Sequence, residues 1–426
     1  MLFVQPVAEQ GGSDHALLRM VRALSADGWT CHVAFPAPSP MDRDFAAAGA
    51  VSHVVPMRRL TTSGGPSRWL RYAGAWPRSV ARLALLAHRV DAAVVHSNSL
   101  HSWYGWAVAW LVRRPHVWHA REVVVQSPAA LAVERFLARR FATLVVAISD
   151  AVAAQLAPGN VRVVLDEADP HEFSPARAGV FRRREGIPDG APLVGAVSRI
   201  DTWKGIGVLL DTLPRLRAAR PDVVVVIAGA AVAGKEPYAA SLAERAAALP
   251  GVRWLGPRRD VAELMADLDV LVQASTEPEP FGLVIVEALT SGTPVVATAA
   301  GGPLGILRGA EPSTGRLVAP GDAGALAEAI VTLLPASPSS TGRRKARPRL
   351  REAPAPPWGA LFSTVLIEAS CRRSRRFRCS GETFPANIGS RDVRVSLSPT
   401  MDGRIDTGSA ELAGNSHRKA QPPASS

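Results

Sequence analysis

The chain has 426 residues, of which 47% are hydrophobic and 20% charged, enough for two domains with substantial cores. No stretch of about 18 uncharged apolar residues occurs, so the sequence predicts no membrane-spanning helix. Its three cysteines are too few for a disulfide framework and form no pattern typical of a zinc site. Most of the net charge of +12 falls in residues 336–426, which hold 16 basic and 7 acidic residues, so we expect a nearly neutral folded body and no nucleic-acid partner.

The N-terminus lacks the basic start and the cleavage site of a signal peptide. Leu2–Gln5 is instead typical of a buried strand. We therefore expect a cytoplasmic protein.

Strand-like apolar runs alternate with helical patterns along the first part of the chain, which is typical of a parallel sheet with crossover helices. The predicted strands are Leu2–Gln5, Thr30–Phe35, Val51–Val55, Ala92–His96, His116–His119, Thr143–Ile148 and Val161–Leu165. The predicted helices are Ser13–Ala26, Ser79–Arg89, Ser102–Val112 and Ala129–Arg140. We predict one Rossmann-like, doubly wound domain over residues 1–178.

A second series of the same kind begins after Pro175, and Asp166–Gly190, rich in proline and charge, is the predicted connection. Its predicted strands are Pro192–Val197, Val223–Ala228, Val252–Leu255, Val270–Gln273, Pro294–Ala297 and Arg316–Val318. Its predicted helices are Gly205–Arg217, Tyr238–Ala248, Val261–Ala266, Leu283–Thr290 and Ala323–Leu334. A second Rossmann-like domain over residues 179–335 follows.

Regular patterning ends near Pro335, where a stretch rich in proline, serine and arginine begins. Trp358–Ser370 carries the apolar stripe of one further helix. Beyond Cys371 the chain is basic and low in large apolar residues. We expect residues 336–426 to form an irregular basic tail that is mostly disordered.

The most informative motif is the segment Glu279–Glu287, with the sequence EPFGLVIVE. It places two carboxylates eight positions apart across a Phe-Gly turn that opens a helix. The N-terminus of a helix offers free backbone N–H groups and a positive dipole end to an anion. Glu279 would then accept hydrogen bonds from sugar hydroxyls, and Glu287 would reach a ribose diol. An ordinary turn with two solvated glutamates is the alternative.

Arg199 and Lys204 bracket a second loop, between a predicted strand and a predicted helix. Ligands bind at the carboxyl edge of doubly wound sheets, where this loop lies. Two fixed cations there can neutralise a departing diphosphate, as a magnesium ion does elsewhere. A surface loop with two solvated cations is the alternative.

Two weaker signals lie in the first domain. The segment Gln10–Ser13 contains Gly11 and Gly12, and glycines after a strand let backbone approach a ligand closely. His119 ends a predicted strand and would point into a crevice. A plain turn and a structural histidine remain open as the alternatives.

Taken together these motifs resemble glycosyltransferase family 4, a retaining family of the GT-B fold. The shared order is the glycine pair, His119, the segment Ser198–Gly205, the segment Glu279–Glu287, and Ser291–Thr298 followed by Gly301 and Gly302. The resemblance covers roughly Leu2 to Leu334. It implies an α/β protein with two Rossmann-like domains facing each other across a cleft.

The resemblance also implies roles for individual residues. Arg199 and Lys204 resemble the diphosphate-binding pair, and Glu279 resembles the carboxylate that contacts the donor sugar. The remaining residues implied are a donor-binding loop, a ribose-binding glutamate, a glycine near the donor phosphate and a histidine near the anomeric centre: Phe281, Gly282, Leu283, Glu287, Gly12 and His119. Asp166–Asp169 departs from the segment that the family often has there.

The implied reaction moves a hexose-type sugar from a nucleotide diphosphate-sugar to an acceptor hydroxyl on a glycan, a lipid-linked molecule or a small molecule. We expect retention of configuration and neither a cofactor nor a metal. Asp267 and Asp269 have the spacing of a metal-binding pair, but they lie where a helix passes into a buried strand, so we interpret them as structural.

Arginines and tryptophans mix in Arg68–Arg78, which could rest on an anionic bilayer and so give a peripheral contact at the inner membrane face. An ordinary helix packed on the sheet is the alternative. Trp103, Trp106 and Trp110 recur at helical spacing and are predicted to be core.

Three other readings of the whole chain stay open. The first is a non-catalytic protein of GT-B type that uses its basic tail for a partner or nucleic acid. The second is another GT-B enzyme, such as a sugar-nucleotide epimerase. The third is a gene product whose altered C-terminus prevents folding.

Overall fold

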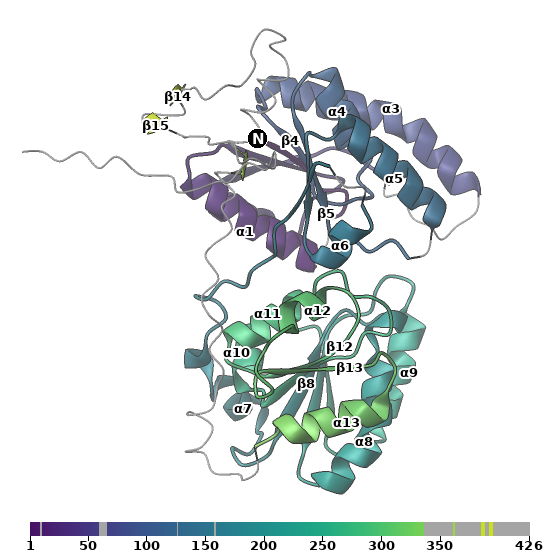
Figure 1. The fold of residues 1–426 in the computed structure, drawn as a ribbon, viewed down its shortest axis with the longest axis vertical. Helices are drawn as coiled ribbons and strands as arrows, with labels where there is room; N and C mark the ends of the chain where they lie inside the picture. The colour runs from purple at the N-terminus through teal and green to yellow at the C-terminus, as the bar shows by residue number, and fades with distance from the viewer. Residues whose placement is uncertain are drawn as a thin grey trace, which may run out of the picture. The chain divides into compact units, whose positions relative to one another are not determined.

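The computed structural model describes residues 1–8, 11–58, 66–125, 127–156, 159–335, 361–362, 385–387 and 392–394. By its contacts the chain divides into two compact units, Met1–Val365 and Leu366–Ser426. Both large sheets belong to the first unit, so the expected boundary at residue 178 falls inside it (Figure 1).

The first sheet contains, within the described ranges, seven parallel strands in the order β3-β2-β1-β4-β5-β6-β7. The strands are β1 (Leu2–Val4), β2 (Cys31–Phe35), β3 (Ala50–Val54), β4 (Val95–Ser97), β5 (His116–Ala120), β6 (Leu144–Ala147) and β7 (Val161–Val163). The order reverses between β1 and β4, as in a doubly wound fold. Each predicted strand of this domain is present.

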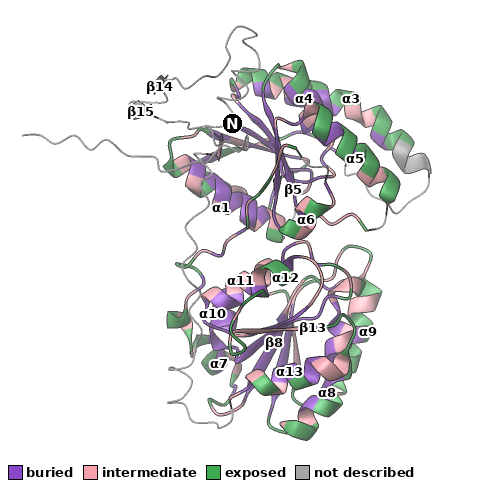
Figure 2. Ribbon diagram, in the orientation of Figure 1, coloured by how far each residue is buried: buried purple, intermediate pink, exposed green. Residues whose placement is uncertain are grey.

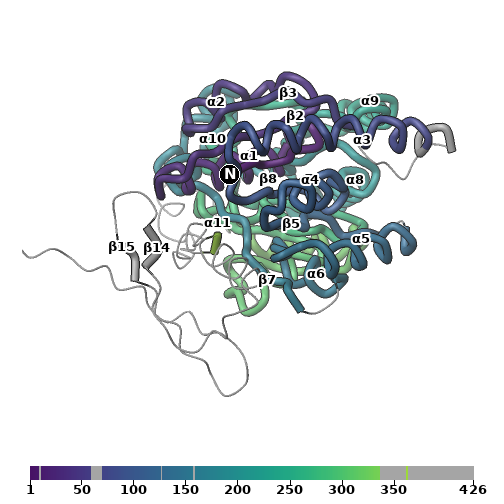
Figure 3. The backbone as a smooth tube through the Cα atoms, turned by 90° about the horizontal axis from the view of Figure 1, so that it is seen from above, coloured from purple at the N-terminus to yellow at the C-terminus, as the bar shows by residue number. Residues whose placement is uncertain are grey.

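Helices cover both faces of the first sheet (Figures 1 and 3). They are α1 (Gly12–Ala26), α2 (Asp42–Ala47), α3 (Pro66–Arg89), α4 (Gly105–Leu111), α5 (Pro128–Phe141) and α6 (Asp150–Ala154). In α1 the buried residues Leu17, Met20, Val21 and Leu24 recur at intervals of one, three or four, which gives the helix one apolar side. Helices α3 and α4 pack on the opposite face, against Leu2, Val4 and Val95.

The second sheet contains, in the part of the chain described, six parallel strands in the order β10-β9-β8-β11-β12-β13. The strands are β8 (Leu193–Val197), β9 (Val224–Ala228), β10 (Val252–Gly256), β11 (Val270–Gln273), β12 (Val295–Thr298) and β13 (Gly315–Val318). Here the order reverses between β8 and β11. Residues 1–335, as far as the structure describes them, thus form an α/β protein with two parallel sheets, as predicted.

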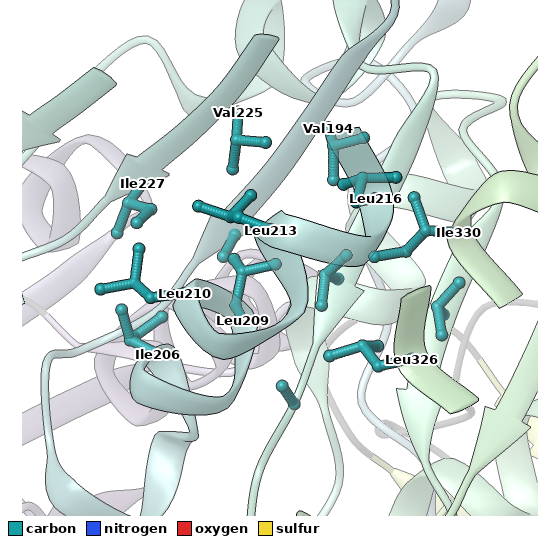
Figure 4. Packing of buried hydrophobic residues seen from close by; sticks show 14 of the residues in the cluster. Val194, Ile206, Leu209, Leu210, Leu213, Leu216, Val225, Ile227, Leu326 and Ile330 are labelled. Carbon is teal, nitrogen blue, oxygen red and sulfur yellow. The ribbon is translucent and has the colours of Figure 1, made fainter. Parts of the chain in front are cut away.

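Two layers of helices enclose the second sheet. They are α7 (Val180–Glu185), α8 (Ile206–Ala219), α9 (Glu236–Ala247), α10 (Val261–Asp267), α11 (Leu283–Thr290), α12 (Gly302–Leu307) and α13 (Ala323–Leu333). Figure 4 shows how Leu209, Leu213 and Leu216 of α8 pack on the strands beside Ile330 of α13. The inner strands β8, β9, β11 and β12 are mostly buried while the helices expose their outer sides (Figure 2), which explains why these strands are apolar without alternation.

Asp267 and Asp269 hold the start of the second domain together. Asp267 accepts hydrogen bonds from the backbone of Gly179 and Arg182, and Asp269 accepts from the Arg182 guanidinium at 2.8 Å and from the Leu193 amide at 2.8 Å. Arg182 and both carboxylates are buried. The interpretation of this pair as structural is confirmed.

The tail agrees with the prediction in one described place and departs from it in another. Residues 361–362 are helical, and Phe362 is fully buried against Trp29 and His96, with ring centroids 6.3 and 5.9 Å away. The rest of the predicted helix Trp358–Ser370 lies outside the described residues. Strands β14 (Pro385–Asn387) and β15 (Asp392–Arg394) pair antiparallel, although the sequence predicted no regular structure there.

Phe362→Ala should lower the free energy of unfolding by about 3 kcal/mol, because it removes a fully buried ring from the first domain. Urea unfolding followed by circular dichroism measures this. Phe136→Ala is the matched control, since Phe136 is 65% exposed and its loss should change stability by less than about 0.5 kcal/mol. Equal unfolding curves for both variants would show that Phe362 is not docked in the folded protein.

Candidate functional site

The predicted motifs of the second domain meet where its strand order reverses. The loop after β8 carries Arg199 and Lys204, and the loop after β11 leads to Glu279. Because β8 and β11 are neighbours and parallel, both loops leave the same edge of the sheet. This edge is the ligand position of doubly wound folds.

Lys204 and Glu279 form an ion pair at this edge. The Lys204 Nζ donates to Glu279 Oε2 at 2.7 Å and lies 4.0 Å from the centre of the Trp203 ring. Glu279 is buried, so its carboxylate needs hydrogen-bond donors from the protein to replace the water that it has lost. The structure therefore brings together two residues that the sequence placed 75 positions apart.

Two further donors hold the same oxygen of Glu279, and the sequence analysis missed both. Ser275 Oγ donates to Oε2 at 2.9 Å, and Gln273 Nε2 donates at 3.1 Å. Gln273 in turn accepts from the amide and hydroxyl of Thr298 at the end of β12. The signal was present, since polar Gln273 and Ser275 follow an apolar strand at the edge where the motifs converge.

Glycines set the position of these loops through close backbone contacts. Gly205, directly after Lys204, has φ +68°, and a Cβ there would overlap the carbonyl oxygen of Ala274. Gly301 has φ +80°, and a side chain on Gly301 or Gly302 would overlap the backbone of Glu279 or Phe281. Only glycine allows these approaches, so the glycines of both motifs act on the geometry of Lys204 and Glu279.

The loop before α11 packs its apolar side chain and presents its backbone. Phe281 is buried in a cluster with Leu100 and Trp118 of the first domain, and Ser149 Oγ donates to the Pro280 carbonyl at 2.6 Å. Gly282 caps α11 with φ +99°. The first amides of a helix lack intrahelical partners, so those at the start of α11 can bind an anion.

The first domain approaches this helix end through its glycine loop. A Cβ on Gly12 would lie 3.8 Å from Leu283 Cδ2, an ordinary contact, and no other protein atom stands within 4 Å among those described. The loop is held by Asp14, which accepts from the Gly11 amide at 3.2 Å and from Gln5 at 2.8 Å. Gln10 lies outside the described residues. No contact within the described protein requires a glycine at position 12. The absence of a side chain there leaves space beside the start of α11.

Glu287 lies on α11, one turn inside the helix, and its side chain is only 14% exposed. Arg19 Nη2 of α1 donates to Glu287 Oε1 at 3.1 Å. Burial raises the pKa of Glu287 to about 7, and the Arg19 charge opposes that rise. The alternative of an ordinary turn with solvated glutamates is wrong for both Glu279 and Glu287.

Arg199 is exposed, and the structure describes no hydrogen bond or ion pair for it within the ranges it covers. The loop position agrees with the prediction, but no hydrogen bond or ion pair is described between its guanidinium and Lys204 or Glu279. Its role in binding a diphosphate stays a prediction.

His119 does not face an open crevice, so that expectation is corrected. It is fully buried at the end of β5, where its ring meets His96 edge-on at 5.4 Å and its Nε2 lies 3.3 Å from Arg121 Nη1. Burial, with the neighbouring Arg121 charge, holds the pKa of His119 well below its usual range. Arg121 also pairs with Asp166, so the aberrant segment Asp166–Asp169 supports this buried cluster. A role of His119 near the anomeric centre stays a prediction.

The sequence matches two family models, one over most of the first sheet and one over the second sheet. Residues 179–349 match "Glycosyl transferases group 1", and residues 11–160 match "Glycosyl transferase 4-like domain". The chain belongs to the family 4 glycosyltransferases. This settles the fold as GT-B, as the resemblance implied.

Several proteins with assigned names are similar to this chain. The D-inositol 3-phosphate glycosyltransferase of Stackebrandtia nassauensis is 32% identical over 49% of this chain and 53% of that protein. The lipopolysaccharide core biosynthesis mannosyltransferase LpsB of Rhizobium meliloti is 28% identical over 60% of this chain and 77% of that one. The match thus spans only about half the length of the first of these relatives.

Among solved structures, Anabaena HepE in complex with UDP-glucose superposes with a TM-score of 0.66 at 26% identity, over 88% of this chain and 94% of HepE. Within the described part of this glycosyltransferase, no helix has the length and apolar character needed to cross a bilayer. The same residues contain no group of three or more His, Cys, Asp and Glu side chains arranged to hold a metal.

Gly302→Ala should lower the free energy of unfolding by at least about 2 kcal/mol, because its methyl group would overlap the Phe281 backbone. Gly12→Ala is the matched control and should unfold like the wild type, since its methyl group meets open space and Leu283. Urea unfolding of both variants measures the difference. A wild-type curve for Gly302→Ala would contradict the close contact between its loop and Phe281.

Proposed function

We propose that this protein transfers a hexose-type sugar from a nucleotide diphosphate-sugar to an acceptor hydroxyl, with retention of configuration and without a metal. The observation that carries the proposal is the Lys204–Glu279 ion pair, 2.7 Å long, beside the helix end that Gly282 opens. It joins a cation for the leaving diphosphate to a carboxylate for the sugar hydroxyls.

The relatives support this reading of the site. HepE has been solved in complex with UDP-glucose, and the other similar proteins are named for transfer of sugars. Their names also span different acceptors, an inositol phosphate and a lipopolysaccharide core. We therefore take the donor class as common to the group, and a glycan, a lipid-linked molecule or a small molecule as the acceptor class.

The chemistry follows from where negative charge grows. As the anomeric bond ionises, the leaving phosphate gains charge, and Lys204 with the amides near Gly282 would stabilise it. Arg199, which is exposed on the same loop, would move onto the diphosphate when the donor binds. The acceptor oxygen would attack from the face that the diphosphate leaves, and the leaving phosphate would take the acceptor's proton.

Two features support a metal-free reaction. Lys204 and Arg199 supply positive charge in the loop that faces the expected diphosphate. Asp267 and Asp269, which have the spacing of a metal-binding pair, already bind Arg182 and backbone amides. Activity in excess chelator is the direct measurement of this part of the proposal.

A thermal-shift screen with UDP-, GDP- and ADP-sugars tests the proposal, followed by an assay for release of the nucleoside diphosphate. At least one donor should raise the melting temperature and be consumed. The comparisons do not favour the non-catalytic alternative. It predicts that no donor is consumed, whether or not a donor binds.

Lys204→Ala should reduce turnover by about 10²–10³-fold, because it removes one fixed donor to the charge that develops on the leaving group. Initial rates at saturating donor measure this. Lys235→Ala is the matched control: Lys235 precedes α9, outside the loops of the site, and its loss should leave the rate unchanged. Near-normal turnover in Lys204→Ala would refute its role.

A peripheral contact with an anionic bilayer is the second function that an observation favours. Helices α3, α4 and α5 contain one acidic residue, Glu134, and it is buried. Trp110 and Phe136 are each 65% exposed, so the prediction that Trp110 is core is wrong. Exposed arginines occur on α3, on α5 and in the turn after α4, where Arg114 pairs with Asp91: Arg71, Arg78, Arg82, Arg89, Arg113, Arg114, Arg135, Arg139 and Arg140.

Three other tryptophans near this surface are packed in the core. Trp103 and Trp106 are half-buried, and Trp76 packs on Trp106 and donates to the Trp103 carbonyl, so these three belong to the core. The side chains of Arg68 and Trp69 lie outside the described residues. Exposed aromatics among arginines, with no exposed carboxylate on the three helices, are the composition that anionic headgroups attract.

The double variant Arg139→Glu/Arg140→Glu should bind vesicles containing phosphatidylglycerol at least tenfold more weakly than the wild type, because each basic residue near such a surface contributes about 1 kcal/mol. Co-sedimentation at low salt measures the bound fraction. Arg183→Glu/Arg184→Glu, on α7 of the second domain, is the charge-matched control and should bind like the wild type. Absence of wild-type binding at low salt would end the membrane proposal.

A further inference from the structure

Arg19 joins three segments that are distant in sequence. It lies on α1 of the first domain, and its Nη2 donates to Glu287 Oε1 on α11 of the second domain at 3.1 Å. Its Nη1 donates to the backbone carbonyl of Glu167 in the connecting segment at 2.6 Å, and its guanidinium lies 5.9 Å from the ring centre of Phe173. The side chain is 17% exposed, so these contacts hold it in one position.

Glu287 receives this contact in a setting that disfavours its charge. The carboxylate is 14% exposed, and burial raises its pKa to about 7. The charged groups that act on it are Arg19 of α1, which lowers the pKa, and Glu172 of the connecting segment, which raises it. Arg19 is therefore the group that favours the ionised form.

We infer that Arg19 is a positioning residue for nucleotide binding: from the first domain it orients the Glu287 carboxylate and keeps it ready to accept the two ribose hydroxyls of the donor. The inference rests on the proposed function, in which Glu287 binds ribose. It adds that the ribose site of the second domain is completed by a residue of the first.

The geometry allows Arg19 and a ribose to bind Glu287 together. An ionised carboxylate has about four acceptor positions, and the described contact with Arg19 uses one, on Oε1. Two hydroxyl donors need two more. A protonated carboxyl would instead keep a hydrogen on one oxygen and lose part of this capacity, so loss of Arg19 should weaken the ribose contact.

The arrangement also couples binding to the contact between the domains. Arg19 is anchored on the Glu167 carbonyl, and a Cβ built on Gly12 of the same helix would lie 3.8 Å from Leu283 Cδ2 at the start of α11. When α1 and α11 are in contact, the diphosphate end and the ribose end of the expected donor site are both complete. A separated pair of domains would leave Glu287 without its cation.

The test compares Arg19→Gln with the wild type in calorimetric titrations of UDP and of inorganic pyrophosphate between pH 6 and pH 8.5. Pyrophosphate shares the diphosphate with UDP but has no ribose. Arg19→Lys keeps the charge, and Arg22→Gln removes an equal charge one turn along the same helix from an exposed position. Melting temperatures of all variants check that each is folded.

Wild-type affinity for UDP should rise with pH through about 7, as Glu287 ionises. Arg19→Gln should bind UDP about tenfold more weakly at pH 7, and the rise should move to higher pH, because the lost cation no longer favours the carboxylate. Pyrophosphate affinity should stay unchanged, Arg19→Lys should retain most of the UDP affinity, and Arg22→Gln should match the wild type.

Three outcomes would overturn the inference. UDP affinity and its pH dependence could be the same in Arg19→Gln and wild type. UDP and pyrophosphate could weaken equally, which would show a general effect on the fold. Arg19→Gln could bind UDP more tightly, which would make Arg19 a competitor of ribose. If the wild type binds none of UDP, GDP and ADP, the proposed function itself fails. That result differs from the other three, which all compare Arg19→Gln with a wild type that binds UDP.

Discussion

The site depends on one carboxylate that is buried with its donors. One oxygen of Glu279 accepts hydrogen bonds from Lys204, Ser275 and Gln273. An apolar residue at this position would leave those three donors unpaired where little water can reach them. Lys204 can reach it because Gly205 lets the β8 loop press against Ala274. Glycines are therefore needed where the loops meet, Gly205 against Ala274 and Gly301 against Glu279, so that the Lys204 ammonium reaches the Glu279 carboxylate.

The two domains contribute different things to this edge. Around the start of α11 the second domain supplies charge and helix amides, while the first supplies apolar contact and space: Leu100 and Trp118 pack around Phe281, and Gly12 leaves room beside Leu283. One turn farther along α11 the first domain also supplies a charge, that of Arg19. Burial of Phe281 fixes the backbone that follows it, because a ring held by neighbours from both domains cannot turn without breaking that packing. The orientation of the α11 amides is thus set by this hydrophobic contact together with the hydrogen bond from Ser149 to the Pro280 carbonyl.

The sequence predicted the strands well because parallel strands buried on both faces are continuous apolar runs. It placed Lys204 and Glu279 at strand ends, and parallel topology then brings such ends to one edge. It missed Arg19 and Ser275, since nothing in a helical position or a lone serine says which distant carboxylate it will face. It was wrong on Trp110 because helical spacing shows that side chains share a face but not which side of the helix is covered.

His119 and Glu287 show why burial is harder to foresee than position. Both are polar residues on elements that the sequence located, yet His119 is enclosed by Arg121 and His96 while Glu287 is enclosed by Arg19. Their pKa values move in opposite directions for the same cause, the loss of water around the charged form, which lowers that of the imidazole and raises that of the carboxyl. A pattern of residue types carries no information about that enclosure.

The raised pKa of Glu287 has a consequence for stability that separates function from folding. Below pH 4.5 the carboxyl is protonated in both the folded and the unfolded chain, and it costs nothing. Between there and pH 7 the unfolded chain ionises while the folded one resists, so the folded state loses stability as pH rises, by at most on the order of 3 kcal/mol for a shift of this size. At neutral pH the Glu287 carboxylate therefore lowers the stability of the ligand-free folded protein. A ligand that donates hydrogen bonds to the ionised form offsets that cost, which is the behaviour expected of a binding site rather than of a core.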